Sequence, residues 1–333
     1  MGLHLSIDRV PGADRMADWR NHGEDEAERE YMESGADVIE YYPSYVESET
    51  DGNLELFTRK WCENGPTVGA FADCGNNGRI IGGENVPEEI LSLILSHVDS
   101  KSLPNCRLVC QRWKNIIDLD IWRFKLEKKV YRQLTNLLHN IRSPFPIIYR
   151  VFKHKSFNRN LIKNPSGEEK LCHWEILKNG GDGWKIEEPP NGADELPFDE
   201  NFPTTSCFST SYIRCTKVQL IDLWAEGLSP IIMDELRPTI YVSEWYAARY
   251  DCASTYTLYV TLLNRNQQKL LAFKQTKRVE QWLGSEWNKV EHEFKNYCEG
   301  VRYVKFFHSG CDCQFWKGHY GSKMSRACVR VVL

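Results

Sequence analysis

The chain of 333 residues lacks any apolar run close to the length of about 20 residues that a membrane-spanning helix needs. Its first residues lack the basic start and the long apolar stretch of a secretory signal. No Asn-x-Ser/Thr sequon occurs, since Asn164 is followed by Pro165. These absences predict a cytoplasmic protein without a transmembrane segment.

The sequence also has little that indicates catalysis or a cofactor. It contains no glycine-rich phosphate loop, no Gly-x-Ser-x-Gly nucleophile elbow and no obvious set of metal ligands. Cys311 and Cys313 follow His308, but one intervening residue is too few for the usual zinc knuckle, and no second pair follows. We therefore expect no cofactor, no metal and no enzymatic activity.

Cysteine is plentiful, with 12 residues, but it is irregularly spaced. Several cysteines, including Cys106, Cys110 and Cys328, fall on apolar faces of the predicted elements. This distribution is typical of reduced, buried cysteine and not of a disulfide framework.

Residues 1–80 differ from the rest of the chain in charge. They hold 17 acidic and 7 basic residues, including the run GEDEAERE at 23–30, whereas the whole chain has a net charge of −4. A segment of this composition has little apolar surface to bury, so we predict a disordered acidic arm. The remaining chain is net positive but has no Lys/Arg stripe, which argues against nucleic-acid binding.

Residues 85–130 contain three short helical patterns. Pro87 and the two glutamates after it are typical of a helix start, because proline fits the first turn and carboxylates favour the positive end of the dipole. We expect Ser102 to cap a second helix and Asp120 to cap a third. The segment is too small for a useful independent core. Apolar residues with three- and four-residue spacing are Ile90, Leu91, Ile94, Leu95 and Val98.

The order of the motifs in this segment resembles the F-box, with a Pro-Glu-Glu opening, a central Leu-Val-Cys, an Arg-Trp and an Ile-Trp end. The motifs are VPEE (86–89), LVC (108–110), RW (112–113) and IW (121–122). F-boxes dock onto the Skp adaptor of a ubiquitin ligase, so the resemblance implies Skp, and through it cullin and RING subunits, as partners. The residues expected at the Skp contact are Pro87, Leu91, Leu95, Leu108, Val109, Trp113 and Trp122.

Residues 131–146 are predicted to form a helical linker. After about residue 147 the spacing of apolar residues changes from the helical pattern to the alternation typical of strands. Residues 174–177 and 184–186 flank the glycine-rich segment 179–183, which predicts a hairpin. The alternation over 255–262 is typical of a half-buried antiparallel strand. A β-sandwich of about ten strands is therefore expected over 147–333, and the fold class is α+β multidomain, a small all-α F-box plus an all-β sandwich. Further strands are predicted at 215–223, 239–245, 270–274, 290–294, 301–307 and 327–332.

Several phrases in this region resemble the F-box-associated domain of the sugar-recognising F-box proteins. The resemblance implies a galactose-binding-like jelly-roll sandwich that recognises substrates. The phrases are NLIKNPSGEE (160–169), GGDGW (180–184), IDLWAEG (221–227), EWYAAR (244–249), GVRY (300–303) and FWKGHYG (315–321).

In the glycan-binding members, the chitobiose core of high-mannose N-glycans sits between loops at one end of the sandwich. The resemblance places the aromatic-Trp-Lys triplet of that site at Phe315, Trp316 and Lys317. It places a second aromatic at Tyr212 and a carboxylate at Asp251. Sugars stack their C–H faces on aromatic rings and need charged groups for their hydroxyls and acetamides, so the chemistry fits. The implied clients are misfolded N-glycosylated proteins, ubiquitinated for degradation near the ER membrane.

The sequence departs from the family pattern at three of these positions. Phe315 replaces the usual Tyr, Tyr212 replaces Phe, and His319 stands where better-known binders have Trp. Two alternatives therefore stay open. The domain can bind a peptide or protein surface instead of a glycan, or Phe315 and Trp316 can belong to the packing of the sandwich.

Overall fold

The structure is a computed structural model, and it describes residues 78, 80–81, 84–122, 124–125, 132–139, 145–200 and 202–333. Apart from Gly78 and Ile80, the predicted acidic arm lies outside these residues. Within the described ranges we find no helix with the length and apolar composition of a membrane span.

The first described segment is helical, as the sequence predicts. After the short hairpin of β1 (Ile80–Ile81) and β2 (Glu84–Asn85) come α3 (Glu88–His97), α4 (Leu103–Cys106), α5 (Gln111–Ile116) and the π-helical turn η3 (Ile117–Ile121). Helix α3 begins after Pro87 and has Glu88 and Glu89 in its first turn, where carboxylates favour the helix dipole.

The two predicted caps in this segment are wrong. Ser102 makes no side-chain capping bond; instead the Asp99 carboxylate accepts bonds from the backbone N–H groups of Lys101 and Ser102, at 2.9 and 3.0 Å. Asp120 starts no helix, because η3 continues directly from α5. Pro104 has no N–H, and the Asn105 N–H donates to the Ser102 carbonyl at 3.0 Å, so these two first-turn positions offer no donor to the Ser102 hydroxyl.

Two more helices follow, α7 (Arg132–His139) and α8 (Phe145–His154). The prolines near residue 145 predict an end to the helical pattern, yet α8 begins there with Pro146 in its first turn, a position that tolerates proline. Helix α8 therefore extends past the predicted boundary at 147. Trp122 is buried, and its ring lies 5.8 Å from Phe145 and 5.4 Å from Phe152.

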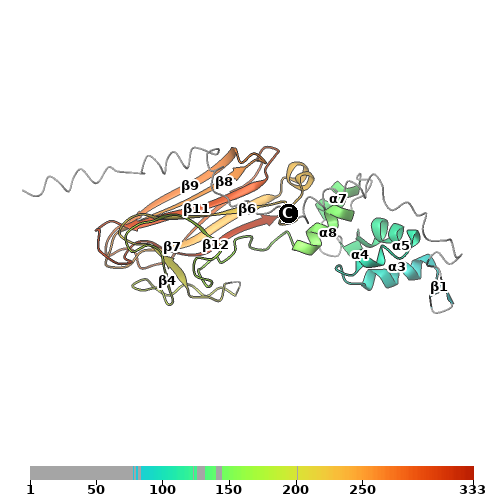
Figure 1. Cartoon of the computed structure of the whole chain (residues 1–333), viewed down its shortest axis with the longest axis horizontal. Coiled ribbons are helices and arrows are strands. Elements are labelled where there is room, and N and C mark those ends of the chain that lie inside the picture. Colours follow the sequence, from blue (N-terminus) through green and yellow to red (C-terminus); the bar gives the residue numbers. More distant parts are fainter. Residues whose placement is uncertain are drawn as a thin grey trace, which may run out of the picture. The chain divides into compact units, whose positions relative to one another are not determined.

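The second half of the described chain is a sandwich of two five-stranded antiparallel sheets, which confirms the predicted fold class (Figure 1). One sheet has the order β10-β7-β12-β5-β4 and the other β3-β6-β11-β8-β9. The strands are β3 (Glu175–Asn179), β4 (Lys185–Glu187), β5 (Cys207–Ser209), β6 (Cys215–Asp222), β7 (Thr239–Ala247), β8 (Ser254–Leu263), β9 (Lys269–Val279), β10 (Asn288–Phe294), β11 (Tyr303–Asp312) and β12 (Lys323–Val332); a second π-helical turn, η4 (Ile232–Leu236), precedes β7.

The predicted hairpin around the glycine-rich segment is wrong, because β3 pairs with β6 in one sheet and β4 pairs with β5 in the other. The connection carries the chain across the sandwich. Trp174 and Trp184, at its two ends, are both buried and both pack edge-on against Phe208. Both indoles therefore belong to the core, one at each end of the crossing.

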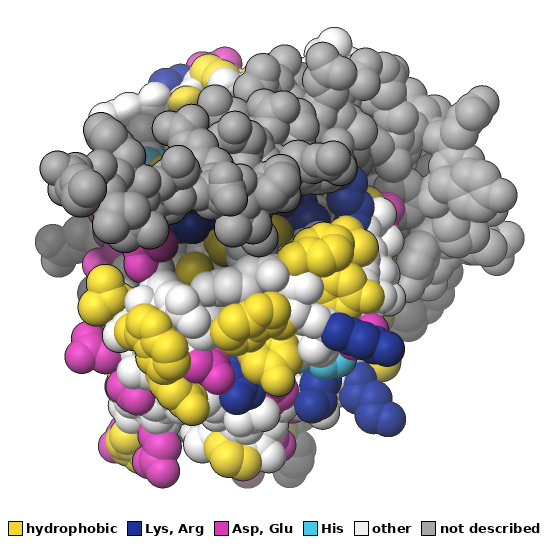
Figure 2. Space-filling view, turned by 90° about the vertical axis from the view of Figure 1, so that its left-hand side faces the viewer, with side chains coloured by type: hydrophobic (Ala, Val, Ile, Leu, Met, Phe, Trp, Pro, Cys, Tyr) yellow, Lys and Arg dark blue, Asp and Glu magenta, His cyan; other side chains and the backbone are white. Residues whose placement is uncertain are grey.

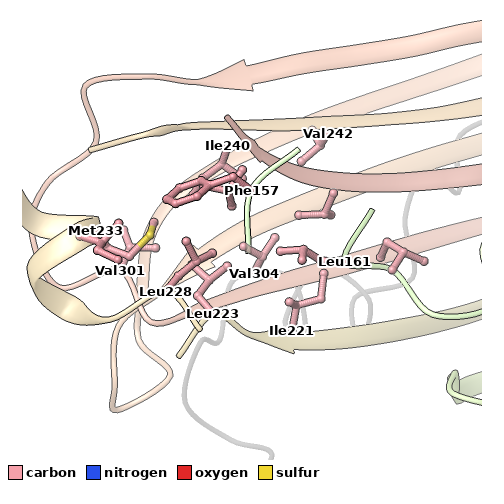
Figure 3. Close-up of a cluster of buried hydrophobic side chains, with 14 of the residues drawn as sticks. Phe157, Leu161, Ile221, Leu223, Leu228, Met233, Ile240, Val242, Val301 and Val304 are labelled. Atoms are coloured by element: carbon pink, nitrogen blue, oxygen red, sulfur yellow. The ribbon is translucent and has the colours of Figure 1, made fainter. Parts of the chain in front are cut away.

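The core lies between the two sheets. Figure 3 shows one cluster of it, in which Phe157 and Leu161 lie among strand residues such as Ile240, Ile221 and Val304. The backbone N–H of Leu161 also donates to the Val329 carbonyl at 2.8 Å. The segment after α8 therefore closes one edge of the core.

The interior also holds ionisable groups. His308 Nδ1 and Glu244 Oε1 are 2.6 Å apart, and Tyr256 donates to the other oxygen of Glu244 at 2.7 Å. Burial lowers the pKa of His308 to about 4, against the opposing effect of Glu244. The Lys217 ammonium lies over the rings of Phe208 and Trp174, and burial lowers its pKa well below the usual value.

Candidate functional site

Loops from both sheets meet at one end of the sandwich. The backbone N–H of Asp312 donates to the Ser211 carbonyl at 3.1 Å, and that of Cys313 donates to the Ala253 carbonyl at 2.8 Å. The Ser211 hydroxyl donates to the Gly318 carbonyl at 2.7 Å. Figure 2 shows this end, where hydrophobic side chains gather beside Lys and Arg. The loop after β11 is therefore fixed to its neighbours, as a rigid binding site requires.

A tight turn presents the aromatic triplet to solvent. The buried Asp312 carboxylate accepts bonds from the backbone N–H groups of Phe315 and Trp316, at 2.6 and 3.1 Å. Burial raises the pKa of Asp312, and these bonds partly offset that rise. Phe315 has φ +62°, an uncommon conformation for a bulky residue. The result is that Phe315 is 69% and Trp316 40% exposed.

Tyr212 joins the triplet from the loop between β5 and β6. Its ring meets Phe315 edge-on, with 5.3 Å between centroids. Gly181 allows this placement, because a Cβ there would lie 2.9 Å from the Tyr212 ring. Tyr212 and Phe315 thus form a pair of contacting rings.

Two residues that the sequence analysis did not select, Arg249 and Tyr320, connect Asp251 to the aromatic triplet by side-chain contacts. Its Oδ1 pairs with Arg249 Nε at 2.6 Å, which raises the pKa of the guanidinium. The Arg249 guanidinium lies 4.6 Å from the centre of the Tyr320 ring, and Tyr320 meets Trp316 edge-on at 5.7 Å. The predicted carboxylate and the predicted stacking indole are therefore linked by side-chain contacts.

The structure brings the five predicted glycan residues to one end of the sandwich. Lys317 is exposed in the same turn as Trp316. The exposure of Phe315 and Trp316 argues against the alternative that they are core residues. Asp312, Arg249 and Tyr320 were missed; the Asp-x-x-Phe spacing is a turn signal that indicates Asp312, but nothing local pairs Arg249 with Tyr320.

The helical segment carries a second exposed surface. Leu108, Val109 and Pro87 are exposed, as a docking role requires, and Trp113 is half-buried with its indole N–H donating to the Gly78 carbonyl at 3.2 Å. Leu91, Leu95 and Trp122 are instead buried in the core of this segment, which argues against the predicted direct contact of these three residues with Skp. The outer face of α3 is formed by Ile90, Leu93 and Ile94.

The misassignment of Leu91 and Leu95 has a simple cause. Ile90 and Ile94 follow the same four-residue spacing one position earlier, so α3 has two adjacent apolar stripes. Periodicity locates both stripes but does not tell which one faces inward. The structure turns Leu91 and Leu95 inward and leaves the isoleucines exposed.

Comparison with known proteins agrees with this division of the chain. Residues 84–125 match the family model of the F-box domain, and residues 152–331 match that of the F-box associated region. F-box only protein 6 of Rattus norvegicus is 38% identical over 252 residues, which cover 74% of this chain and 85% of the relative. F-box only protein 44 of Homo sapiens is 37% identical over 250 residues, with 74% and 95% coverage.

More distant matches add little. F-box only protein 2 of Bos taurus is 34% identical over 253 residues, with 74% of this chain and 83% of the relative covered. A xylan-binding domain from Paenibacillus barcinonensis covers 53% of this chain and 96% of its own length, at 10% identity and a TM-score of 0.31. A structural likeness this weak supports no functional argument.

An F-box domain followed by an F-box associated region indicates a substrate receptor of a ubiquitin ligase. The chain belongs to the family of F-box only proteins that carry an F-box associated region. The F-box domain indicates binding to the Skp adaptor within a Skp–cullin–F-box ubiquitin ligase.

Proposed function

We propose that the sandwich binds the chitobiose core of high-mannose N-glycans on misfolded glycoproteins and delivers them for ubiquitination and ER-associated degradation. The observation that carries the proposal is the turn that the Asp312 carboxylate holds, which leaves Phe315 and Trp316 exposed beside Tyr212. In this account the chain is a non-catalytic receptor without a cofactor, and it works in the cytoplasm near the ER membrane.

The chemistry of the site suits an N-acetylglucosamine disaccharide. The indole of Trp316 offers a stacking face for the C–H side of a pyranose ring. Asp251 can accept bonds from hydroxyl or acetamide N–H groups, while Arg249 holds it in place at 2.6 Å. Lys317 can donate to hydroxyl or carbonyl oxygens. The arrangement thus combines one broad apolar face with few directional polar groups, as small-ligand sites do.

The departures at positions 212 and 315 compensate one another in this proposal. The family pattern has a hydroxyl on the residue at 315 and none at 212, and this chain has the reverse. Because the Tyr212 and Phe315 rings are in contact, with 5.3 Å between centroids, the pair retains one phenolic hydroxyl. We therefore propose that Tyr212 supplies the hydrogen bond that Phe315 lacks.

The competing proposal is a receptor whose sandwich binds a peptide or protein surface and no glycan. Competition separates the two. The complex of this chain with Skp is incubated with an unfolded glycoprotein that carries high-mannose N-glycans, and free chitobiose is added in increasing amounts. Displacement by chitobiose supports glycan recognition, whereas equal capture of the glycoprotein before and after enzymatic removal of its glycans refutes it.

A further inference from the structure

A second group of exposed apolar side chains lies at the same end of the sandwich, and the glycan proposal does not use it. Trp282 is 67% and Leu283 79% exposed in the loop between β9 and β10, and Tyr250 from the loop after β7 is also exposed. The Tyr250 and Trp282 rings lie 6.1 Å apart. We refer to Tyr250, Trp282 and Leu283 as the Trp282 patch.

The backbone holds Trp282 outward at a conformational cost. Its φ is +69°, and among the described Phe, Trp and Tyr residues only Trp282 and Phe315 adopt the left-handed region. The Trp282 N–H donates to the Tyr250 carbonyl at 2.7 Å, which fixes this conformation. Bulky residues in this region are rare, and such strain is concentrated at functional sites. Since Trp282 fills no core space, its position indicates a role at the surface.

Three polar side chains that precede Trp282 in the chain, those of Arg278, Glu280 and Gln281, already have partners. Arg278 Nε lies 2.7 Å from Glu280 Oε1, and the Gln281 amide donates to the Asp251 carbonyl at 2.8 Å. The patch therefore presents mainly indole, phenol and isobutyl surface. Such a surface suits an aliphatic or aromatic side chain better than another sugar, whose hydroxyls need hydrogen-bond partners.

The Gln281 bond also places the patch next to the proposed glycan site. Asp251 belongs to that site, and Tyr250 is its neighbour in the chain. The chitobiose core is attached covalently to an asparagine, so a client polypeptide bound through it lies within the length of one disaccharide from the proposed glycan site. An extended chain covers about 3.3–3.6 Å per residue, so a few residues on either side of the asparagine can reach a neighbouring loop.

We propose that the Trp282 patch binds an apolar side chain of the client polypeptide within a few residues of the glycosylated asparagine. This inference rests on the proposed glycan function. Folded glycoproteins bury most of their large apolar side chains, whereas unfolded ones expose them. The second contact is made at the high effective concentration that the first contact creates, so it favours unfolded clients.

The test uses the Skp complex of the full chain and four probes in calorimetric titrations. The probes are free chitobiose, a synthetic glycopeptide with chitobiose on Asn between Leu and Phe, the same glycopeptide with Ser at both flanking positions, and the Leu/Phe peptide without sugar. Trp282→Asn removes the indole while keeping a residue that tolerates positive φ. Leu271→Ser, at an exposed leucine of β9, is the control for losing an apolar side chain elsewhere.

For the wild type we expect the Leu/Phe glycopeptide to bind about tenfold tighter than the Ser glycopeptide, a difference of one good apolar contact. Trp282→Asn should abolish that ratio, and neither variant should change the affinity for free chitobiose. Equal affinity of the wild type for both glycopeptides overturns the inference, as does a loss of chitobiose affinity in Trp282→Asn. If chitobiose fails to bind but the Leu/Phe peptide binds through Trp282, the glycan proposal fails and the apolar contact stands. If no probe binds, both fail.

Discussion

Trp316→Ala is the substitution that separates a binding residue from a packing residue. Trp316 is 40% exposed and meets Tyr320 edge-on, so truncation opens the loop surface without creating a closed cavity. A buried Trp truncated to Ala costs about 3–5 kcal/mol of stability, which includes a cavity term. With a little over half of the side chain buried and no cavity term, we expect a loss of about 1–2 kcal/mol.

We expect Trp316→Ala to weaken chitobiose binding as well as lower stability. Loss of a stacking aromatic at the centre of a site costs about 1–3 kcal/mol of binding free energy. This corresponds to a roughly 5- to 150-fold weaker affinity for chitobiose. In a domain of this size, the stability loss should lower the melting temperature by about 2–8 °C.

The assay measures melting temperature and chitobiose affinity on the same purified variant. Trp174→Ala is the matched control, because Trp174 is buried and stacks on His308 at 4.6 Å between ring centroids. That control should lose about 3–5 kcal/mol of stability. Trp316 is not a binding residue if Trp316→Ala is destabilised as much as Trp174→Ala, or if this variant binds chitobiose as well as the wild type does.

Three further predictions address other parts of the molecule. Tyr212→Phe should weaken chitobiose binding by about 1 kcal/mol, and adding Phe315→Tyr to that variant should restore the wild-type affinity. If calorimetry shows that the double variant binds as weakly as Tyr212→Phe or more weakly, a hydroxyl at position 315 does not replace the one at position 212. Leu93→Glu, on the exposed face of α3, should abolish co-purification with Skp at an unchanged melting temperature, and retained Skp would exclude this face. The pKa of His308 falls from about 6.5 to about 4 on folding, so the unfolded state binds more protons between these pH values. The free energy of unfolding should therefore fall by about 3 kcal/mol as the pH drops from 6.5 to 4. Urea titrations of His308→Gln should show a smaller loss over this pH range, and a loss equal to that of the wild type would contradict the lowered pKa of His308.

The sequence predicts which segments form helices and strands better than it predicts how the strands pair. Alternation predicts most strands, but it does not show that β3 and β4 lie in different sheets. A glycine-rich connection between two strand patterns is typical of a hairpin, and no local feature of the sequence indicates that this connection crosses between sheets. Strand β5 was missed because its three residues, Cys207–Ser209, are all buried and show no apolar–polar alternation, whereas the equally short β4 was indicated by the glycine-rich segment before it.

The candidate site shows the same limit. The resemblance to a known family selects Tyr212, Asp251 and the triplet at 315–317, and the structure places them at one end of the sandwich. It does not select Arg249 and Tyr320, whose contact joins loops that are distant in the sequence. On α3, the pattern finds the apolar residues but not the direction that each faces, because both neighbouring stripes are apolar. Which stripe is buried depends on tertiary packing, and the apolar pattern of a single sequence does not reveal it.

The central claim is that one chain connects a glycan to the ligase adaptor, and a three-component capture tests it most directly. Beads that carry chitobiose are incubated with purified Skp, with and without the full chain, and eluted with free chitobiose. The account predicts that Skp is retained only when the chain is present and is released by the free sugar. Skp that stays unbound, or that is retained but not released by chitobiose, would contradict it.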